Sequence, residues 1–262
     1  MKHIKIKTPA KVNLTLEILN KRSDGYHNLQ SVMQTVSLYD YLDFKLEEAE
    51  GLQIKLSGNS DEIPYDEKNI IYKAVSTFLD ISSIKANVNV YIDKNIPVSA
   101  GLAGGSTDGT GVILALNEIF GKPFDNLQLH KICSTLGSDL NFCLEGGCKK
   151  ATSRGEILED MEFIERNVSL IKPLKLGINT KEAYKKFSQK PKTLDRSNFV
   201  NDLEWAIIED YSELKMIKQL YPQAVMTGSG STFFAFDTQF KQDENFWVKN
   251  NIKTIPTGCT II

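Results

Sequence analysis

The sequence has few cysteines, and their spacing is not that of a metal site or a disulfide framework. Four cysteines occur among 262 residues, with no CxxC pair and no histidine cluster beside them. Structural zinc sites and disulfide-rich domains show paired spacings instead. We therefore interpret them as reduced thiols in or near the core of a cytosolic protein. They are Cys133, Cys143, Cys148 and Cys259.

Long hydrophobic runs are also missing. No stretch approaches the roughly 20 apolar residues that a membrane-spanning helix needs. The opening residues, up to Lys7, alternate like a strand and contain no apolar core of signal-peptide length. These two absences predict a cytoplasmic protein without a membrane partner.

An excess of positive charge is absent as well. The 31 Lys and Arg residues face 33 Asp and Glu residues, which gives a net charge of −2. A nucleic-acid binder normally carries a basic field, so a nucleic-acid partner is not expected, although a local basic pocket for a phosphorylated substrate is compatible with these numbers. The hydrophobic share of 41% and the charged share of 24% are typical of a soluble globular protein.

Strand and helix patterns are mixed without regular alternation, which predicts an α+β protein with two lobes. We place the boundary near Arg154 and Gly155, giving lobes of residues 1–153 and 154–262. Strands are predicted at residues 3–8, 10–18, 32–37, 41–47, 51–57, 86–92, 168–171, 232–236, 252–255 and 259–262, and a hairpin at 143–152. Helices are predicted at 69–79, 112–120, 124–136, 180–187, 203–208 and 213–220.

A glycine-rich segment, Ile96–Asp108, separates the strand 86–92 from the helix that follows it. In this order the backbone N–H groups and the positive end of the helix dipole point at one spot. Glycines let the backbone approach an anion closely, while Ser106 and Thr107 supply hydroxyl donors or an N-cap. The segment is therefore predicted to bind phosphate; a turn that merely caps a helix is the alternative. It matches neither the Walker loop nor the dinucleotide fingerprint.

Lys11 and Asp139 are candidates for the chemistry. Transfer of a phosphoryl group to an alcohol needs a carboxylate near the hydroxyl and positive charge near the migrating group. A lysine beside such an aspartate keeps the carboxylate ionised. The residues alone leave two other readings open, because Lys11 lies on the polar face of a strand and Asp139 stands where a helix-capping aspartate is common.

Five motifs, in order from about residue 8 to residue 236, resemble those of the GHMP kinases, small-molecule kinases named after galactose, homoserine, mevalonate and phosphomevalonate. The loop reads Pro-x3-Gly-Leu-x-Gly-Gly-Ser, like the second signature of that family. The first two of the five motifs resemble the branch that acts on a cytidyl diphospho-sugar alcohol. The five are Pro9–Leu14, Asp24–His27, Pro97–Ser106, Gly137–Asp139 (with Phe142 and Gly146–Gly147 following) and Thr227–Ser231.

The resemblance implies a two-lobed GHMP kinase fold. Its N-terminal lobe would be like domain 2 of ribosomal protein S5 and would carry ATP binding and catalysis; a ferredoxin-like C-terminal lobe would lie on the substrate side. The implied reaction is ATP-dependent phosphorylation of the 2-hydroxyl of the cytidyl substrate, giving the 2-phosphate and ADP, in the methylerythritol phosphate route to isoprenoid precursors. ATP and Mg2+ are the implied cofactors, with Ser106 as the candidate metal ligand. A monomer or weak homodimer is expected.

The resemblance also assigns residues. Asp139 would accept the proton of the substrate hydroxyl and Lys11 would hold the charges in place. Asn13 would bind substrate, and Tyr26 and His27 would meet its cytosine. The second aromatic partner of the base would be Tyr184. The ATP phosphates would be wrapped by Pro97, Val98, Ser99, Ala100, Gly101, Leu102, Ala103, Gly104, Gly105, Ser106 and Thr107.

Several features depart from the family pattern or fit it weakly. Gly109 and Gly111 stand where alanines are favoured, and each interior helical glycine costs roughly 1 kcal/mol, so the helix is predicted to begin later or more loosely. Lys94 and Asn69 are weaker candidates for contact with the nucleoside. The alternative functions are another GHMP kinase, of homoserine or mevalonate type, and, less favoured, a non-catalytic RNA-binding module.

Overall fold

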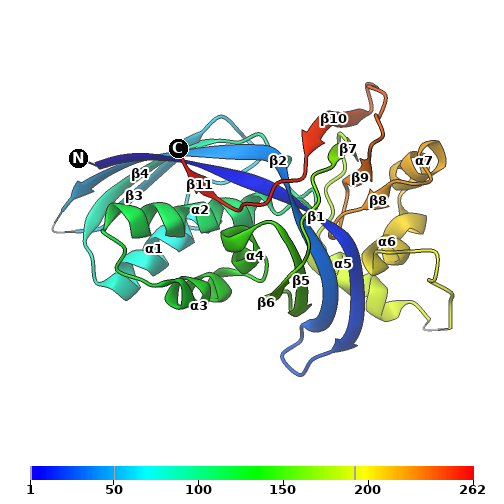
Figure 1. The fold of residues 1–262 in the computed structure, drawn as a ribbon, viewed down its shortest axis with the longest axis horizontal. Helices are drawn as coiled ribbons and strands as arrows, with labels where there is room; N and C mark the ends of the chain where they lie inside the picture. Colours follow the sequence, from blue (N-terminus) through cyan, green and yellow to red (C-terminus); the bar gives the residue numbers. More distant parts are fainter. Residues whose placement is uncertain (1, 50, 192) are drawn as a thin grey trace.

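The computed structural model describes residues 2–49, 51–191 and 193–262. Within these residues the chain forms two β-sheets, each accompanied by helices (Figure 1). The larger sheet has the order β11-β1-β2-β4-β3, and β5 and β6 extend it from β2. The α+β prediction is confirmed. The strands of this sheet are β1 (Lys2–Lys21), β2 (His27–Glu48), β3 (Gln53–Gly58), β4 (Ala86–Asp93), β5 (Cys148–Ser153), β6 (Ile157–Asp160) and β11 (Thr260–Ile261).

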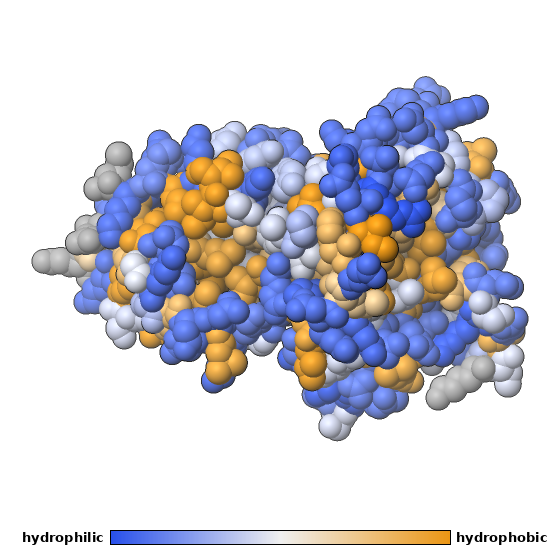
Figure 2. Space-filling model, viewed as in Figure 1, coloured by the Kyte–Doolittle hydropathy of each residue, from blue (hydrophilic) through white to orange (hydrophobic). Residues whose placement is uncertain are grey.

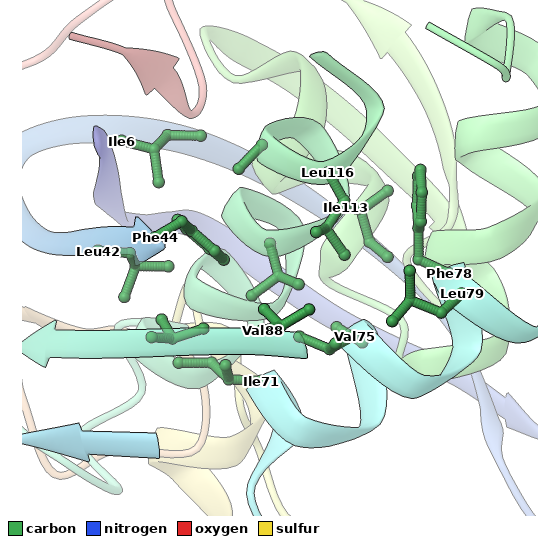
Figure 3. Close-up of a cluster of buried hydrophobic side chains, with 14 of the residues drawn as sticks. Ile6, Leu42, Phe44, Ile71, Val75, Phe78, Leu79, Val88, Ile113 and Leu116 are labelled. Atoms are coloured by element: carbon green, nitrogen blue, oxygen red, sulfur yellow. The ribbon is translucent and has the colours of Figure 1, made fainter. Parts of the chain in front are cut away.

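Four helices pack on the larger sheet (Figure 1). Apolar residues at every second position of β4 and at helical spacing in the first helix meet in one core (Figure 3). Among them are Val75, Phe78 and Val88, whose side chains are all buried. The periodicities therefore predicted both elements correctly. The helices are α1 (Ile70–Ser82), α2 (Gly104–Ile119), α3 (Asn126–Leu136) and α4 (Leu140–Glu145).

The second sheet is antiparallel, with the order β10-β7-β9-β8, and packs with helices of the second half of the chain. The chain then returns to the first sheet, where β11 pairs with β1 (Figure 1, red beside blue). The predicted division after residue 153 stays a prediction. The elements are β7 (Asn167–Pro173), α5 (Thr180–Gln189), α6 (Asp202–Ile207), the 3-10 turn η1 (Ile208–Asp210), α7 (Ser212–Leu220), β8 (Val225–Met226), β9 (Phe233–Phe236) and β10 (Phe246–Lys253).

The surface is mixed. Hydrophilic residues cover much of the face seen in Figure 2, with hydrophobic residues showing between them over the helices of the first sheet. Among the described residues, no helix combines the length and the apolar character needed to cross a membrane.

Three local predictions were wrong. The strands predicted separately at 32–37 and 41–47 belong to one continuous strand, β2. Residues 143–152 form no hairpin: they contain the end of α4 and most of β5, separated by Gly146 and Gly147. The two strands predicted around Pro9 are a single strand, β1, because a register shift between Pro9 and Ala10 accommodates the proline within the pairing with β2.

Helix α2 also differs from the prediction, since it begins at Gly104 and runs through Gly109 and Gly111. These glycines are buried and allow close packing. A Cβ at Gly111 would lie 2.5 Å from Thr8 Cγ2 on β1, and one at Gly109 would lie 3.0 Å from Ile70 Cγ1. The glycines therefore set the distance between α2 and its neighbours instead of loosening the helix start.

Replacing Gly111 by alanine will destabilise the protein. Overpacking costs about 1–3 kcal/mol, which exceeds the gain of about 1 kcal/mol in helix propensity. Urea unfolding without ligand measures the change in free energy. Gly105→Ala is the control, because a Cβ there would meet only Ile70 Cγ2 at 3.7 Å. Equal stability of the two variants would contradict the packing role.

Candidate active site

A cavity of about 1040 Å3 is lined by residues of both halves of the chain. It brings together segments far apart in the sequence: the strand β1, the start of β2, the glycine-rich segment, the turn before α4, and α5. Most residues predicted for the site line it. They are Lys11, Asn13, Tyr26, His27, Pro97, Val98, Ser99, Ala100, Gly101, Leu102, Ala103, Gly104, Gly105, Ser106, Asp139 and Tyr184.

Thr107 is the exception among the predicted phosphate-binding residues. It is fully buried, its hydroxyl lies 3.4 Å from Cys259 Sγ, and it is not among the residues that line the cavity. The structure therefore does not bring its side chain to the other predicted residues. The sequence could not show this, because the neighbour of Thr107, Cys259, comes from the segment just before β11, about 150 residues later.

The glycine-rich segment ends directly in α2. Ala103 is the N-cap residue with φ 59°, and no side chain caps the helix. The first N–H groups of a helix have no partner within it, and together with the helix dipole they favour an anion. Gly101 has φ +76°, and a Cβ there would overlap the carbonyl oxygen of Thr227. The segment thus offers backbone donors at the cavity and is held closely against the later loop 227–231.

Lys11 and Asp139 meet in this cavity, with Lys11 Nζ 3.9 Å from Asp139 Oδ2. The ammonium also donates to Asn13 Oδ1 at 2.6 Å and to the carbonyl oxygen of Gly101 at 2.9 Å. Burial lowers the pKa of Lys11, while the charge of Asp139 opposes that shift. One buried cation therefore links the carboxylate to the glycine-rich segment.

The carboxylate of Asp139 is not used as a helix cap. Asp139 precedes α4 at the N-cap position, but its side chain makes no capping hydrogen bond. The side chain is 35% exposed and lines the cavity. An aspartate held beside a buried ammonium and open to a cavity can accept a proton from a bound hydroxyl group.

Asn13 already has partners in the protein. Its Oδ1 accepts from Lys11, its Nδ2 donates to Ser31 Oγ at 2.8 Å, and its backbone N–H donates to Thr227 Oγ1 at 2.9 Å. The geometry therefore gives Asn13 a part in orienting Lys11. Its predicted contact with substrate stays a prediction.

Aromatic side chains gather at another part of the cavity. The rings of His27 and Tyr184 stack with centroids 5.3 Å apart and an interplanar angle of 23°. Tyr26 is 55% exposed, and the guanidinium carbon of Arg154 lies 5.2 Å from the centroid of its ring. Burial and the nearby charge of Lys21 lower the pKa of His27, which favours the neutral imidazole. Such groups can stack on a base and bond its polar edge.

A buried charge network beneath the glycine-rich segment was missed by the sequence predictions. Asp40 Oδ1 accepts from the backbone N–H groups of Asn95 at 2.5 Å and Ile96 at 2.7 Å, and Lys94 Nζ bridges Asp40 and Asp108. Burial and the charge of Asp108 raise the pKa of Asp40 to about 7, against the effect of Lys94. The network fixes the start of the segment to β2.

The same network explains where Lys94 lies. Burial lowers the pKa of Lys94, but the two carboxylates outweigh it and the net shift is upward. Lys94 lines the cavity, yet its ammonium serves as an anchor between two strands and a helix. The sequence contained a signal for this network. Asp40 alternates with Leu38 and Leu42 on the buried face of β2, where an acidic residue needs a partner.

Two further predicted segments are fixed by side-chain hydrogen bonds. Asn69 lines the cavity but caps α1, accepting from Ile71 N at 2.9 Å and donating to the carbonyl oxygen of Pro64 at 2.6 Å. Ser229 lines it too, with its hydroxyl 2.9 Å from that of Thr180 on α5. Both side chains therefore line the cavity while hydrogen bonds within the protein hold them in place.

Comparison with known proteins agrees with this geometry. Residues 69–147 match the family described as GHMP kinases N terminal domain. The fold resembles that of homoserine kinase from Cytophaga hutchinsonii, with a TM-score of 0.68 and 17% identity over 100% of this chain and 98% of that one. At such identity the likeness concerns the fold alone. The fold and the family match together define a GHMP-type small-molecule kinase, with ATP as the co-substrate.

Two curated relatives are more specific. Proteins of Clostridium tetani (37% identical, over 95% of this chain and 96% of the relative) and Syntrophomonas wolfei (38% identical, over 87% of each) are both named 4-diphosphocytidyl-2-C-methyl-D-erythritol kinase. A crystal structure of 4-(cytidine 5'-diphospho)-2C-methyl-D-erythritol kinase superposes with a TM-score of 0.75 at 26% identity, over 95% of this chain and 99% of that one. This chain belongs to the 4-diphosphocytidyl-2-C-methyl-D-erythritol kinase family.

Proposed function

We propose that the chain transfers the terminal phosphoryl group of ATP to the 2-hydroxyl of 4-diphosphocytidyl-2-C-methyl-D-erythritol, giving the 2-phosphate and ADP. This is a step of the methylerythritol phosphate route to isoprenoid precursors. Family membership supports the substrate. The observation that carries the chemistry is the 3.9 Å approach of Lys11 Nζ to Asp139 Oδ2 in a cavity shared with the uncapped start of α2.

In the proposed mechanism Asp139 accepts the proton of the 2-hydroxyl as that oxygen attacks the phosphorus. The Lys11 ammonium attracts the carboxylate across the 3.9 Å gap and offsets negative charge that builds up during transfer. The backbone N–H groups at the start of α2 bind the phosphates that leave. The protein thus contributes position and electrostatic complementarity, with one proton transfer.

We propose Mg2+ as the companion of ATP. Among residues 2–49, 51–191 and 193–262, no group of three His, Cys, Asp or Glu side chains could hold a metal ion. In a kinase, phosphate oxygens and waters supply most of the Mg2+ ligands, so the ion needs no cluster of protein side chains. Ser106 would supply a hydroxyl from the protein. The bound ion would neutralise phosphate charge.

The aromatic cluster is proposed to bind the cytosine, and Tyr26→Ala tests this assignment. Stacking of an aromatic ring on a base is worth about 1–3 kcal/mol, so the KM for the cytidyl substrate will rise about 5- to 150-fold. The KM for ATP will stay unchanged. Steady-state kinetics with each substrate varied in turn measures both values.

Tyr41→Ala is the matched control. Tyr41 is also exposed, at 40%, and does not line the cavity. An unchanged KM for the cytidyl substrate in the Tyr26 variant would refute the stacking role. A rise in both variants would indicate a general loss of structure.

ADP release with a panel of acceptors tests the proposed function. We expect turnover with 4-diphosphocytidyl-2-C-methyl-D-erythritol and none with homoserine or mevalonate. Turnover without any cytidyl requirement would point to another GHMP kinase. Salt-sensitive RNA retention without ADP release would favour the binding-module alternative.

The surroundings of the enzyme complete the proposal. We propose a cytoplasmic location, which the small-molecule substrates support, and a monomer or weak homodimer. Sedimentation at several protein concentrations measures the oligomeric state.

A further inference from the structure

The turn between β5 and β6 has no role in the mechanism above, yet it borders the cavity through Arg154. Its backbone has positive φ angles, 63° at Ser153 and +113° at Gly155. The carboxylate of Glu156 accepts from the N–H of Arg154 at 2.8 Å and from Ser153 Oγ at 3.1 Å. The turn is therefore held by its own hydrogen bonds, and they position the backbone of Arg154.

This turn lies beside both ends of the site. On one side the guanidinium of Arg154 lies over the ring of Tyr26, 5.2 Å from its centroid. On the other side a Cβ built on Gly155 would lie 4.0 Å from Asp139 Oδ1. Adjacent residues of one turn thus lie beside the proposed base site and the proposed proton acceptor.

The covalent structure of the substrate class says what must lie between those ends. In a cytidyl diphospho-sugar alcohol the diphosphate joins the nucleoside to the portion that carries the hydroxyl group. If the cytosine is at Tyr26 and the hydroxyl at Asp139, the diphosphate passes the turn. We infer that Arg154 binds this diphosphate and so selects acceptors that carry it. The inference rests on the proposed function.

The donors of Arg154 suit this role better than those of its neighbours. Its Nε is 3.5 Å from Glu156 Oε1, and its two terminal amino groups make no hydrogen bond within the described part of the chain. By contrast, Arg22 is bound to Asp24, Asn28 and Ser153. The planar fork of an arginine matches phosphate oxygens in a bidentate manner.

Besides Lys11 and Lys94, four further lysines line the cavity and add positive charge. They are Lys21, Lys68, Lys181 and Lys185. A lysine acts on phosphate as a point charge with a flexible stem, whereas the selection we infer needs a donor pair fixed between two sites.

The test compares two ligands that differ only in the diphosphate. Binding of CDP and of cytidine is measured by titration for the unchanged protein, Arg154→Gln and Arg154→Lys. We expect Arg154→Gln to weaken CDP about 10- to 100-fold and cytidine less than about twofold. Arg154→Lys will be intermediate. The KM for the cytidyl substrate will rise with the Kd for CDP, and the KM for ATP will not.

Arg166→Gln is the matched control, because Arg166 makes the same kinds of contact away from the cavity. Its guanidinium lies 4.0 Å from the centroid of Phe236, and it is paired with Asp237 at 2.7 Å. Equal weakening of CDP and cytidine by Arg154→Gln would overturn the inference, since Arg154 would then act only through Tyr26. Unchanged CDP binding, or a rise in the KM for ATP alone, would also overturn it.

Different results would contradict the proposed function and the inference about Arg154. If the proposed function is wrong, the unchanged protein itself will release no ADP with the cytidyl substrate. If only the inference is wrong, the unchanged protein turns over normally and the variants show no difference between CDP and cytidine.

Discussion

Replacing Asp139 by asparagine will lower kcat by about 10²- to 10⁴-fold, the range in which a positioned general base contributes. The amide has the same shape as the carboxylate but accepts no proton at neutral pH. Lys11 Nζ will keep its hydrogen bonds to Asn13 and Gly101, so the glycine-rich segment will stay in place. The KM for ATP will therefore change little. ADP release at saturating concentrations of both substrates measures the effect.

Asp160→Asn is the control for this experiment. Asp160 is also paired with a lysine, Lys149, but its side chain is 87% exposed and it does not line the cavity. That variant will keep its kcat. Normal turnover by the Asp139 variant would show that the attacking hydroxyl loses its proton to another acceptor.

Replacing Lys11 by methionine will lower kcat about 10²- to 10³-fold, as loss of one preorganised electrostatic contact does elsewhere. The substitution keeps most of the length of the side chain and removes its charge. It also leaves Asn13 Oδ1 and the Gly101 carbonyl oxygen without their buried donor, which will lower the free energy of unfolding as well. Thermal unfolding and kcat together separate the two effects.

The double variant of Lys11 and Asp139 provides the decisive comparison. Groups that act as one unit show losses that do not add. We expect kcat of the double variant to be close to that of the more impaired single variant. Losses that multiply would mean that the two side chains act independently, contrary to the 3.9 Å contact.

The lowered pKa of Lys11 also predicts a pH dependence. Burial disfavours the ammonium, so its pKa lies below the usual 10.5 in spite of Asp139. In the proposed mechanism the charged form of Lys11 is the active one. Titration of Lys11 will therefore leave kcat constant at lower pH, and kcat will fall as pH rises through the lowered pKa. Lys11→Arg will move that alkaline limb upward, because arginine stays charged. An unchanged limb would assign it to another group.

Periodicity predicted those parts of the fold that depend on local sequence. The alternation of Val88, Val90 and Ile92 predicted β4, and the spacing of Ile71, Val75 and Phe78 predicted α1, because each buries one continuous apolar face. The position of the glycine-rich segment between such a strand and a helix predicted its place at the start of α2. The resemblance brought Lys11 and Asp139 into one hypothesis, and the structure places them together.

What could not be predicted depends on contacts between distant segments. Asp40 and Asp108 are unremarkable acids in the sequence, and only the packing of α2 on β1 and β2 brings them to one ammonium, that of Lys94. Gly111 departs from the family pattern because a side chain there would clash with Thr8, more than a hundred residues earlier. The role of Thr107 likewise depends on Cys259.

The return of the chain to the first sheet has a consequence for synthesis. Cys259 donates its backbone N–H to the carbonyl oxygen of Cys143 in α4, and a Cβ on Gly146 would overlap the backbone of Gly258. The helix that follows Asp139 thus rests on residues translated more than a hundred codons later. While the ribosome is still making the second half, the nascent first half lacks this support. Acquisition of activity during translation should therefore be late and abrupt, because the carboxylate of Asp139, the proposed proton acceptor, becomes fixed only when both halves are present.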